Sequence, residues 1–116
     1  MTFTESIKTC FSKYADFDGR ASRSEYWWFV LFIVLVGFGV SIVSEMLALV
    51  FYVGTLLPSI AAAARRLHDT NRSGWLQLIA LIPLIGWLIV IYFLIQEPQE
   101  PNRFGSPATA SEPTIN

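Results

Sequence analysis

Two short polar segments hold the side chains that could do chemistry. They run from Gly19 to Trp27 and from Arg65 to Trp75. Together they supply guanidinium groups, which bind phosphate or carboxylate through two parallel hydrogen bonds, and also one imidazole and two carboxylates. The candidate ligand- or partner-binding residues are Arg20, Arg23, Glu25, Arg65, Arg66, His68, Asp69, Arg72 and Trp75.

The second segment places its polar groups on one side of a helix, if the helix continues through it. Arg65, His68 and Asp69 stand at positions i, i+3 and i+4 and would then share a face. There is a simpler interpretation of the same residues. Arginines at the ends of membrane helices are ordinary topology determinants, and tryptophans there form the ordinary interfacial belt.

The residue types favour binding over catalysis. The chain has one histidine and one cysteine, Cys10, so it has neither an intrachain disulfide nor a cysteine-based metal site. We predict no catalytic residue, no metal and no cofactor. An enzyme that acts on lipid headgroups, with His68 as the base beside Asp69, is an alternative.

Long uncharged runs flank the two polar segments. They extend from Tyr26 to Ser44, from Met46 to Ala64 and from Trp75 to Ile95. As helices, these runs would be roughly 28 to 31 Å long, which matches the hydrocarbon core of a bilayer. The sequence therefore predicts an all-α membrane protein. Its three transmembrane helices cover about 23–44, 46–66 and 74–95, within a single membrane domain over 1–95.

The N-terminal residues predict a short amphipathic helix over about 3–14. Thr2 followed by Glu5 fits a capping box, in which each side chain satisfies a backbone N–H at the helix start. This helix either lies in the membrane surface or packs against the spans. Its apolar face consists of Phe3, Ile7, Cys10, Phe11 and Tyr14.

The spans carry their own start, turn and kink signals. Ser22 and Glu25 form a second potential capping box before the first span. Glu45 is most simply the tip of the turn between spans one and two, and an intramembrane carboxylate is the alternative. Pro58 and Pro83 lie inside spans two and three, where each removes a backbone donor and kinks its helix.

The kinks have a specific consequence, because each proline frees a carbonyl one turn earlier. These are the carbonyls of Gly54 and Ile79. After Ile95 the sequence becomes polar and proline-rich, which predicts a flexible tail over 96–116, anchored near Phe104.

Basic residues set the predicted orientation. They cluster before the first span and between spans two and three, the turn at Glu45 has none, and the tail has only Arg103. The positive-inside rule then places the N-terminus in the cytoplasm and, with three crossings, the C-terminus outside.

Several ordered motifs resemble those of a known family. The chain is similar to the domain-of-unknown-function family 805 of small bacterial inner-membrane proteins (YhaH-like), and the resemblance extends over nearly the whole chain up to Gly105. It implies a location in the bacterial inner (plasma) membrane and no known activity, and the three predicted spans would make the protein multi-pass. The matching pieces are Gly19–Trp27, Arg65–Thr70, Arg72–Trp75, Ile82–Trp87 and Asn102–Gly105.

The sequence as a whole predicts a non-enzymatic module. It would bind anionic phospholipid or a partner protein through the cytoplasmic-face cluster of arginine, histidine, aspartate and tryptophan. Partners would be the lipid bilayer and either a second copy or another membrane protein, with no nucleic acid. A subunit of an oligomeric channel or transporter is the main alternative, since three spans are too few to enclose a pathway.

Overall fold

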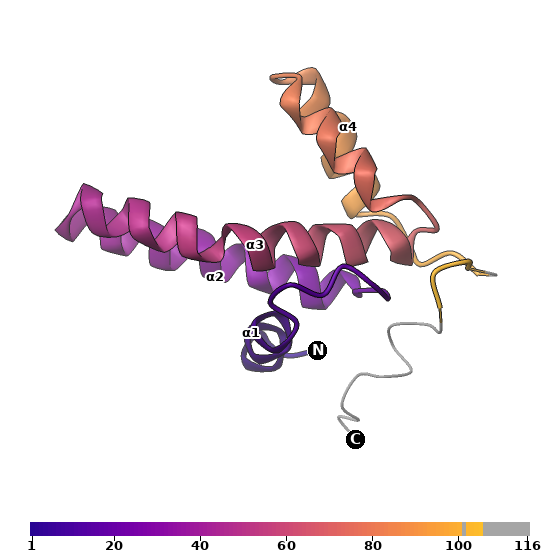
Figure 1. Cartoon of the computed structure of the whole chain (residues 1–116), viewed down its shortest axis with the longest axis horizontal. Helices are drawn as coiled ribbons and strands as arrows, with labels where there is room; N and C mark the ends of the chain where they lie inside the picture. Colours follow the sequence, from indigo (N-terminus) through magenta and orange to yellow (C-terminus); the bar gives the residue numbers. More distant parts are fainter. Residues whose placement is uncertain (101, 106–116) are drawn as a thin grey trace.

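The structure, a computed structural model, describes residues 1–100 and 102–105. Over these ranges all regular elements are helices, which confirms the predicted all-α class. Two long helices lie side by side, a short helix seen end-on runs across them, and a second hairpin leaves the other side of the pair (Figure 1). The elements are α1 (Phe3–Ser12), α2 (Arg23–Val43), α3 (Glu45–Asp69), the 3₁₀ helix η1 (Gly74–Leu81) and α4 (Ile85–Leu94).

α2 and α3 correspond to the first two predicted spans, and both are long and apolar enough to cross a membrane. They contain 21 and 25 residues. A single residue, Ser44, separates them. Its hydroxyl accepts a hydrogen bond from the backbone N–H of Leu47 at 3.3 Å, so Ser44 ends α2 and also caps α3. Glu45 is exposed at this turn, as its interpretation as a turn tip predicted.

The third predicted span is wrong as a continuous helix. Residues 74–95 form a hairpin, in which η1 ends at Leu81 and α4 begins at Ile85. Pro83 has no N–H to donate within a helix, and the chain reverses at the next residue, Leu84, which has a φ of 63°. The hairpin closes tightly, since a Cβ on Gly86 would lie 1.9 Å from the carbonyl oxygen of Ile79. Sequence analysis predicted a kink at Pro83 and missed the reversal.

The N-terminal helix is present, and it packs against the spans. Its capping box is complete: the Thr2 hydroxyl accepts from the N–H of Glu5 at 3.2 Å, and the Glu5 carboxylate accepts from the N–H of Thr2 at 2.9 Å. Cys10 on its inner face packs with Phe29 of α2 and Ala62 of α3. The helix ends at Ser12, two residues before the predicted limit.

Pro58 frees the carbonyl of Gly54, as predicted, and the fold supplies a partner for it. The hydroxyl of Tyr14, just beyond α1, donates a hydrogen bond to this carbonyl. α3 continues through Pro58 as one helix. A polar group in the middle of an apolar helix is therefore satisfied by the segment that packs across it.

The first residues of the predicted tail contact the end of α3. We call residues 96–100 and 102–105 the C-terminal strap, because they lie along the end of α3. The N–H of Gln99 donates to the carbonyl of Asp69 at 2.9 Å, and the Asn102 side chain donates to the carbonyl of His68 at 2.7 Å. Phe104 stacks on His68 with ring centroids 4.0 Å apart, which confirms the predicted anchor. The flexibility predicted for 96–116 stays a prediction, and 106–116 lie outside the described residues.

Candidate functional site

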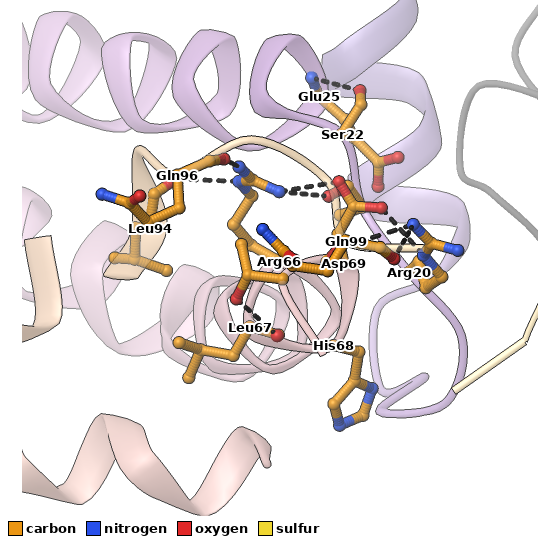
Figure 2. Close-up of polar contacts among 12 residues, drawn as sticks. Arg20, Ser22, Glu25, Arg66, Leu67, His68, Asp69, Leu94, Gln96 and Gln99 are labelled. Carbon is orange, nitrogen blue, oxygen red and sulfur yellow. Dashed lines mark hydrogen bonds and ion pairs between the residues drawn. The ribbon is translucent and has the colours of Figure 1, made fainter. Parts of the chain in front are cut away.

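The candidate site lies where α3 ends, between the start of α2, the linker before it and the C-terminal strap. Figure 2 shows Arg66 reaching from α3 toward Leu94 and Gln96 on one side and Asp69 on the other, with Arg20 beyond Asp69. The side chains of the three arginines here are 0% exposed. We call this group the arginine cluster, and its members are Arg20, Glu25, Arg65, Arg66 and Asp69, all buried.

Asp69 bridges two of the arginines. Its Oδ1 accepts from Nε of Arg20 at 2.8 Å, and its Oδ2 accepts from Nη1 of Arg66 at 2.8 Å. Both carboxylate oxygens are thus engaged by charged donors. Because these three charged groups are buried, the attraction between Asp69 and the two arginines is screened far less than it would be in water. This attraction offsets the cost of removing the ions from water.

Arg65 takes its countercharge from α2. Its Nη1 forms an ion pair with the Glu25 carboxylate, and its Nε donates to the carbonyl of Asp16 at 3.2 Å. The predicted capping box at the start of α2 is therefore only half formed. The Ser22 hydroxyl accepts from the N–H of Glu25 at 3.2 Å, but the Glu25 carboxylate serves Arg65. Leaving a buried guanidinium without an opposite charge costs more free energy than leaving the helix start without its second side-chain cap.

Arg66 caps the end of α4 and thereby fixes the hairpin to α3. Its Nε donates to the carbonyl of Leu94 at 2.8 Å, and its Nη2 donates to the carbonyl of Gln96. The indole N–H of Trp27 also donates to the carbonyl of Leu94, at 3.2 Å. The last carbonyls of a helix have no partner within it, so these donors satisfy groups that would otherwise be left open.

His68 is held as a structural residue. Its Nδ1 donates to the carbonyl of Gly19 at 2.8 Å, since a carbonyl can only accept, and its ring face is covered by Phe104. The neighbouring Asp69 has both oxygens committed to arginines. The histidine and the aspartate therefore do not form the acid–base pair that an enzyme acting on lipid headgroups would need.

The remaining predicted site residues lie outside the cluster. Arg23 is exposed, and Trp75 is 78% exposed on the outer side of the hairpin. Arg72, in the loop after α3, lies over the ring of Phe93 in α4, 4.6 Å from its centroid.

Sequence analysis missed the contribution of the strap to the site. Glu100 forms an ion pair with Arg20, and Asn102 caps the end of α3. The available signal was the motif Asn102–Gly105, which contains Phe104, one of the few bulky apolar residues after Ile95.

Cys10 borders the cluster and is buried. Its Sγ lies 3.8 Å from the carbonyl oxygen of Glu25, and the Ser6 hydroxyl one turn earlier donates to the same carbonyl. Burial, reinforced by the nearby Glu25 carboxylate, raises the pKa of Cys10 to about 11. The thiol is therefore protonated near neutral pH and packed away from solvent, which suits a core residue and not a nucleophile.

Beside the hairpin, the surface of the membrane helices is hollowed. A laterally open groove of about 240 Å³ runs between α3 and the η1–α4 hairpin. In its wall the Gln77 side chain donates to the carbonyl of Ile60 at 3.3 Å. Elsewhere the lining is mostly apolar, and its residues are Tyr26, Ser59, Ile60, Ala63, Gln77, Ala80, Val90 and Leu94.

Together these features define a small integral membrane protein in which five charged residues form a buried ion-pair cluster. Among the described residues, no three His, Cys, Asp or Glu side chains are grouped to hold a metal ion. Residues 14–106 match the family model described as "Protein of unknown function (DUF805)", and the chain belongs to this family, as its motifs predicted.

Two relatives support the same assignment. Inner membrane protein YhaI of Escherichia coli (strain K12) is 40% identical over 101 residues, which cover 80% of this chain and 86% of YhaI. Inner membrane protein YhaH of the same strain is 42% identical over 105 residues, covering 79% of this chain and 86% of YhaH. No solved structure matches the chain. The protein is thus a bacterial inner-membrane protein of a family without an assigned activity.

Proposed function

We propose that this protein is a non-enzymatic membrane module that assembles with a second copy of itself through the η1–α4 hairpin. In this proposal α2 and α3 cross the membrane, and the hairpin enters it from the cytoplasmic side and returns there. The N-terminus and the C-terminal strap then both lie in the cytoplasm.

The observation that carries the proposal is the irregular, exposed and apolar tip of the hairpin. Leu81 is 79% exposed and Leu84 is 68% exposed, and the chain between η1 and α4 is not helical. No charged residue occurs from Trp75 to Ile95, so water is a poor environment for this hairpin. Lipid is a poor environment for its tip, because irregular backbone at membrane depth must be covered by protein.

We favour a second copy of the protein as the partner that covers the hairpin tip. Every molecule of the protein has the same tip to cover, and closed homo-oligomers are the commonest assemblies. The lateral groove between α3 and the hairpin offers a further apolar surface for the partner copy. α4 has 10 residues and is about 15 Å long, half the hydrocarbon thickness, so it cannot complete a crossing alone.

The other predicted functions have less support. Most N–H donors of Arg20, Arg65 and Arg66 are already hydrogen-bonded within the protein. This disfavours binding of anionic lipid by the arginine cluster while all these contacts are in place. The stacked and hydrogen-bonded His68 disfavours an enzyme. A channel or transporter subunit would also be expected to assemble with further copies. It would also need a polar path along α2 and α3, whose outward side chains are predominantly apolar.

The topology predicts which positions an impermeant thiol reagent reaches in intact cells. In a Cys10→Ser background, Glu45→Cys should label from outside, whereas Glu97→Cys should label only after the membrane is permeabilised. The reason is that the strap is hydrogen-bonded to the arginine-rich end of α3, the end opposite Glu45. A third crossing would instead have placed position 97 outside. Labelling of Glu97→Cys in intact cells would contradict the proposed topology and support a third crossing.

The assembly predicts a crosslink at the hairpin tip. A photo-crosslinking amino acid at Leu81 should give an adduct of twice the 13.1 kDa chain mass in native membranes. The same group at Leu49, which is also exposed but lies on the regular helix α3, should react with lipid and give no such adduct. An adduct of a different mass at position 81, or none, would rule out self-assembly through the tip.

A further inference from the structure

The C-terminal strap covers one edge of a buried guanidinium. Arg20 is fixed from one side by Asp69, which accepts from its Nε at 2.8 Å. Its outer edge faces the strap, where Nη1 forms an ion pair with Glu100 and donates to the carbonyl of Gly105 at 3.3 Å. Nη2 makes only long contacts, 3.5 Å each, to the carbonyls of Asp69 and Gln99.

The charges of the arginine cluster balance only when the strap is in place. The cluster buries the cations Arg20, Arg65 and Arg66 and the anions Glu25 and Asp69. The third carboxylate is that of Glu100, which is 51% exposed and comes from the strap. One buried positive charge is therefore neutralised by a half-exposed side chain that belongs to no helix, and a buried charge without a partner attracts another anion.

The outer edge of Arg20 has the geometry that oxyanions need. Nη1 and Nη2 form a planar fork, which matches two oxygens of a phosphate or carboxylate. Asp69 already holds this fork in one orientation, so little side-chain entropy would be lost on binding. Arg20 also lies shortly before Tyr26 and Trp27 at the start of α2, where aromatic residues mark the depth of lipid headgroups.

We propose that the outer edge of Arg20 is a binding site for the phosphate of an anionic phospholipid headgroup, and that Glu100 occupies it as a built-in competitor. A tethered group competes at an effective concentration in the millimolar range, so a weaker external ligand is excluded while the strap is in place. Displacement of the Glu100 side chain would expose the fork while Asp69 keeps it in position. This site is separate from the hairpin tip and does not depend on self-assembly.

Glu100→Gln tests the proposal, because it removes the competing charge from an exposed side chain. In native mass spectrometry after incubation with phosphatidylglycerol in mild detergent, this variant should retain about tenfold more of the lipid than the parent, the factor expected for one charge-assisted contact. Glu97→Gln is the matched control, since it makes the same change on the same strap at an exposed residue that forms no ion pair in the described part of the chain. It should leave retention unchanged.

Two further arms decide the ligand and the residue. Adding Arg20→Lys to Glu100→Gln should abolish most of the gain, because lysine keeps the charge and loses the fork. If Glu100→Gln gained as much retention of inorganic phosphate in the absence of lipid, the site would be assigned to free phosphate. The assignment to a lipid headgroup would then be overturned. Equal retention of phosphatidylglycerol by Glu100→Gln and by either the parent or Glu97→Gln would overturn the site itself.

Discussion

Replacing Asp69 with asparagine should lower the free energy of unfolding by about 3 to 5 kcal/mol, the cost of breaking a buried ion pair from one side. Asp69 is fully buried and accepts from Arg20 and Arg66 at 2.8 Å each. Asparagine has nearly the same shape, but it removes the charge and one acceptor. Two buried guanidinium groups would then share a single neutral oxygen.

Asp18→Asn is the matched control for this prediction. Asp18 is exposed in the linker before α2, so the same chemical change there should alter stability by no more than about 0.5 kcal/mol. Denaturant titration of both variants in detergent micelles, followed by tryptophan fluorescence, measures the difference. Equal midpoints for the two variants would mean that Asp69 does not hold the cluster together.

Arg66→Lys should cost about 3 kcal/mol, although it keeps the charge that determines topology. Arg66 donates to the carbonyls of Leu94 and Gln96 and to the Asp69 carboxylate. A lysine ammonium is a point charge on a flexible stem and cannot reach all three acceptors at once. We expect insertion in the correct orientation, together with a loosened hairpin.

Hydrogen exchange separates this local effect from general destabilisation. Amides near the end of α4 and in the strap should exchange much faster in Arg66→Lys, while those in the middle of α2 should change less. Arg23→Lys is the control, since Arg23 is exposed, and it should behave like the parent. Uniform acceleration across all helices would show that Arg66 does not act through the hairpin. Replacing Arg65, Arg66 and Arg72 together by lysine should destabilise the protein for the same structural reason. We do not expect loss of bound lipid to be the cause.

The sequence by itself determined the two long helices and their caps. Uncharged runs of bilayer length leave few alternatives to spanning helices, because backbone groups in lipid must be satisfied within the segment. The pair Thr2 and Glu5 caps α1, and the Ser22 hydroxyl caps α2, as local spacing predicts, since a cap depends only on residues within one turn. The polar segments that meet at the end of α3 were also identified from their residue types.

Only the tertiary structure decided the shape of residues 74–95. The same apolar composition suits a third span and a hairpin, so hydropathy does not separate them. The hairpin depends on the contact of Gly86 with the carbonyl of Ile79 and on the capping of α4 by Arg66, which is far away in sequence. Contacts between segments that are distant in the chain leave no local periodicity to detect.

The tertiary structure also decided the role of the arginines. A pattern of basic residues beside a span is the same whether the guanidinium groups face lipid headgroups or are buried. Burial is possible here because Glu25 and Asp69 supply the opposite charge, and because backbone carbonyls from the linker, α4 and the strap accept hydrogen bonds from Arg65 and Arg66. Among the buried side-chain nitrogen and oxygen atoms of the described residues, only Nη2 of Arg65 is left without a hydrogen-bond partner. Desolvating an arginine is costly unless all these partners are present together, and only the folded chain brings them together.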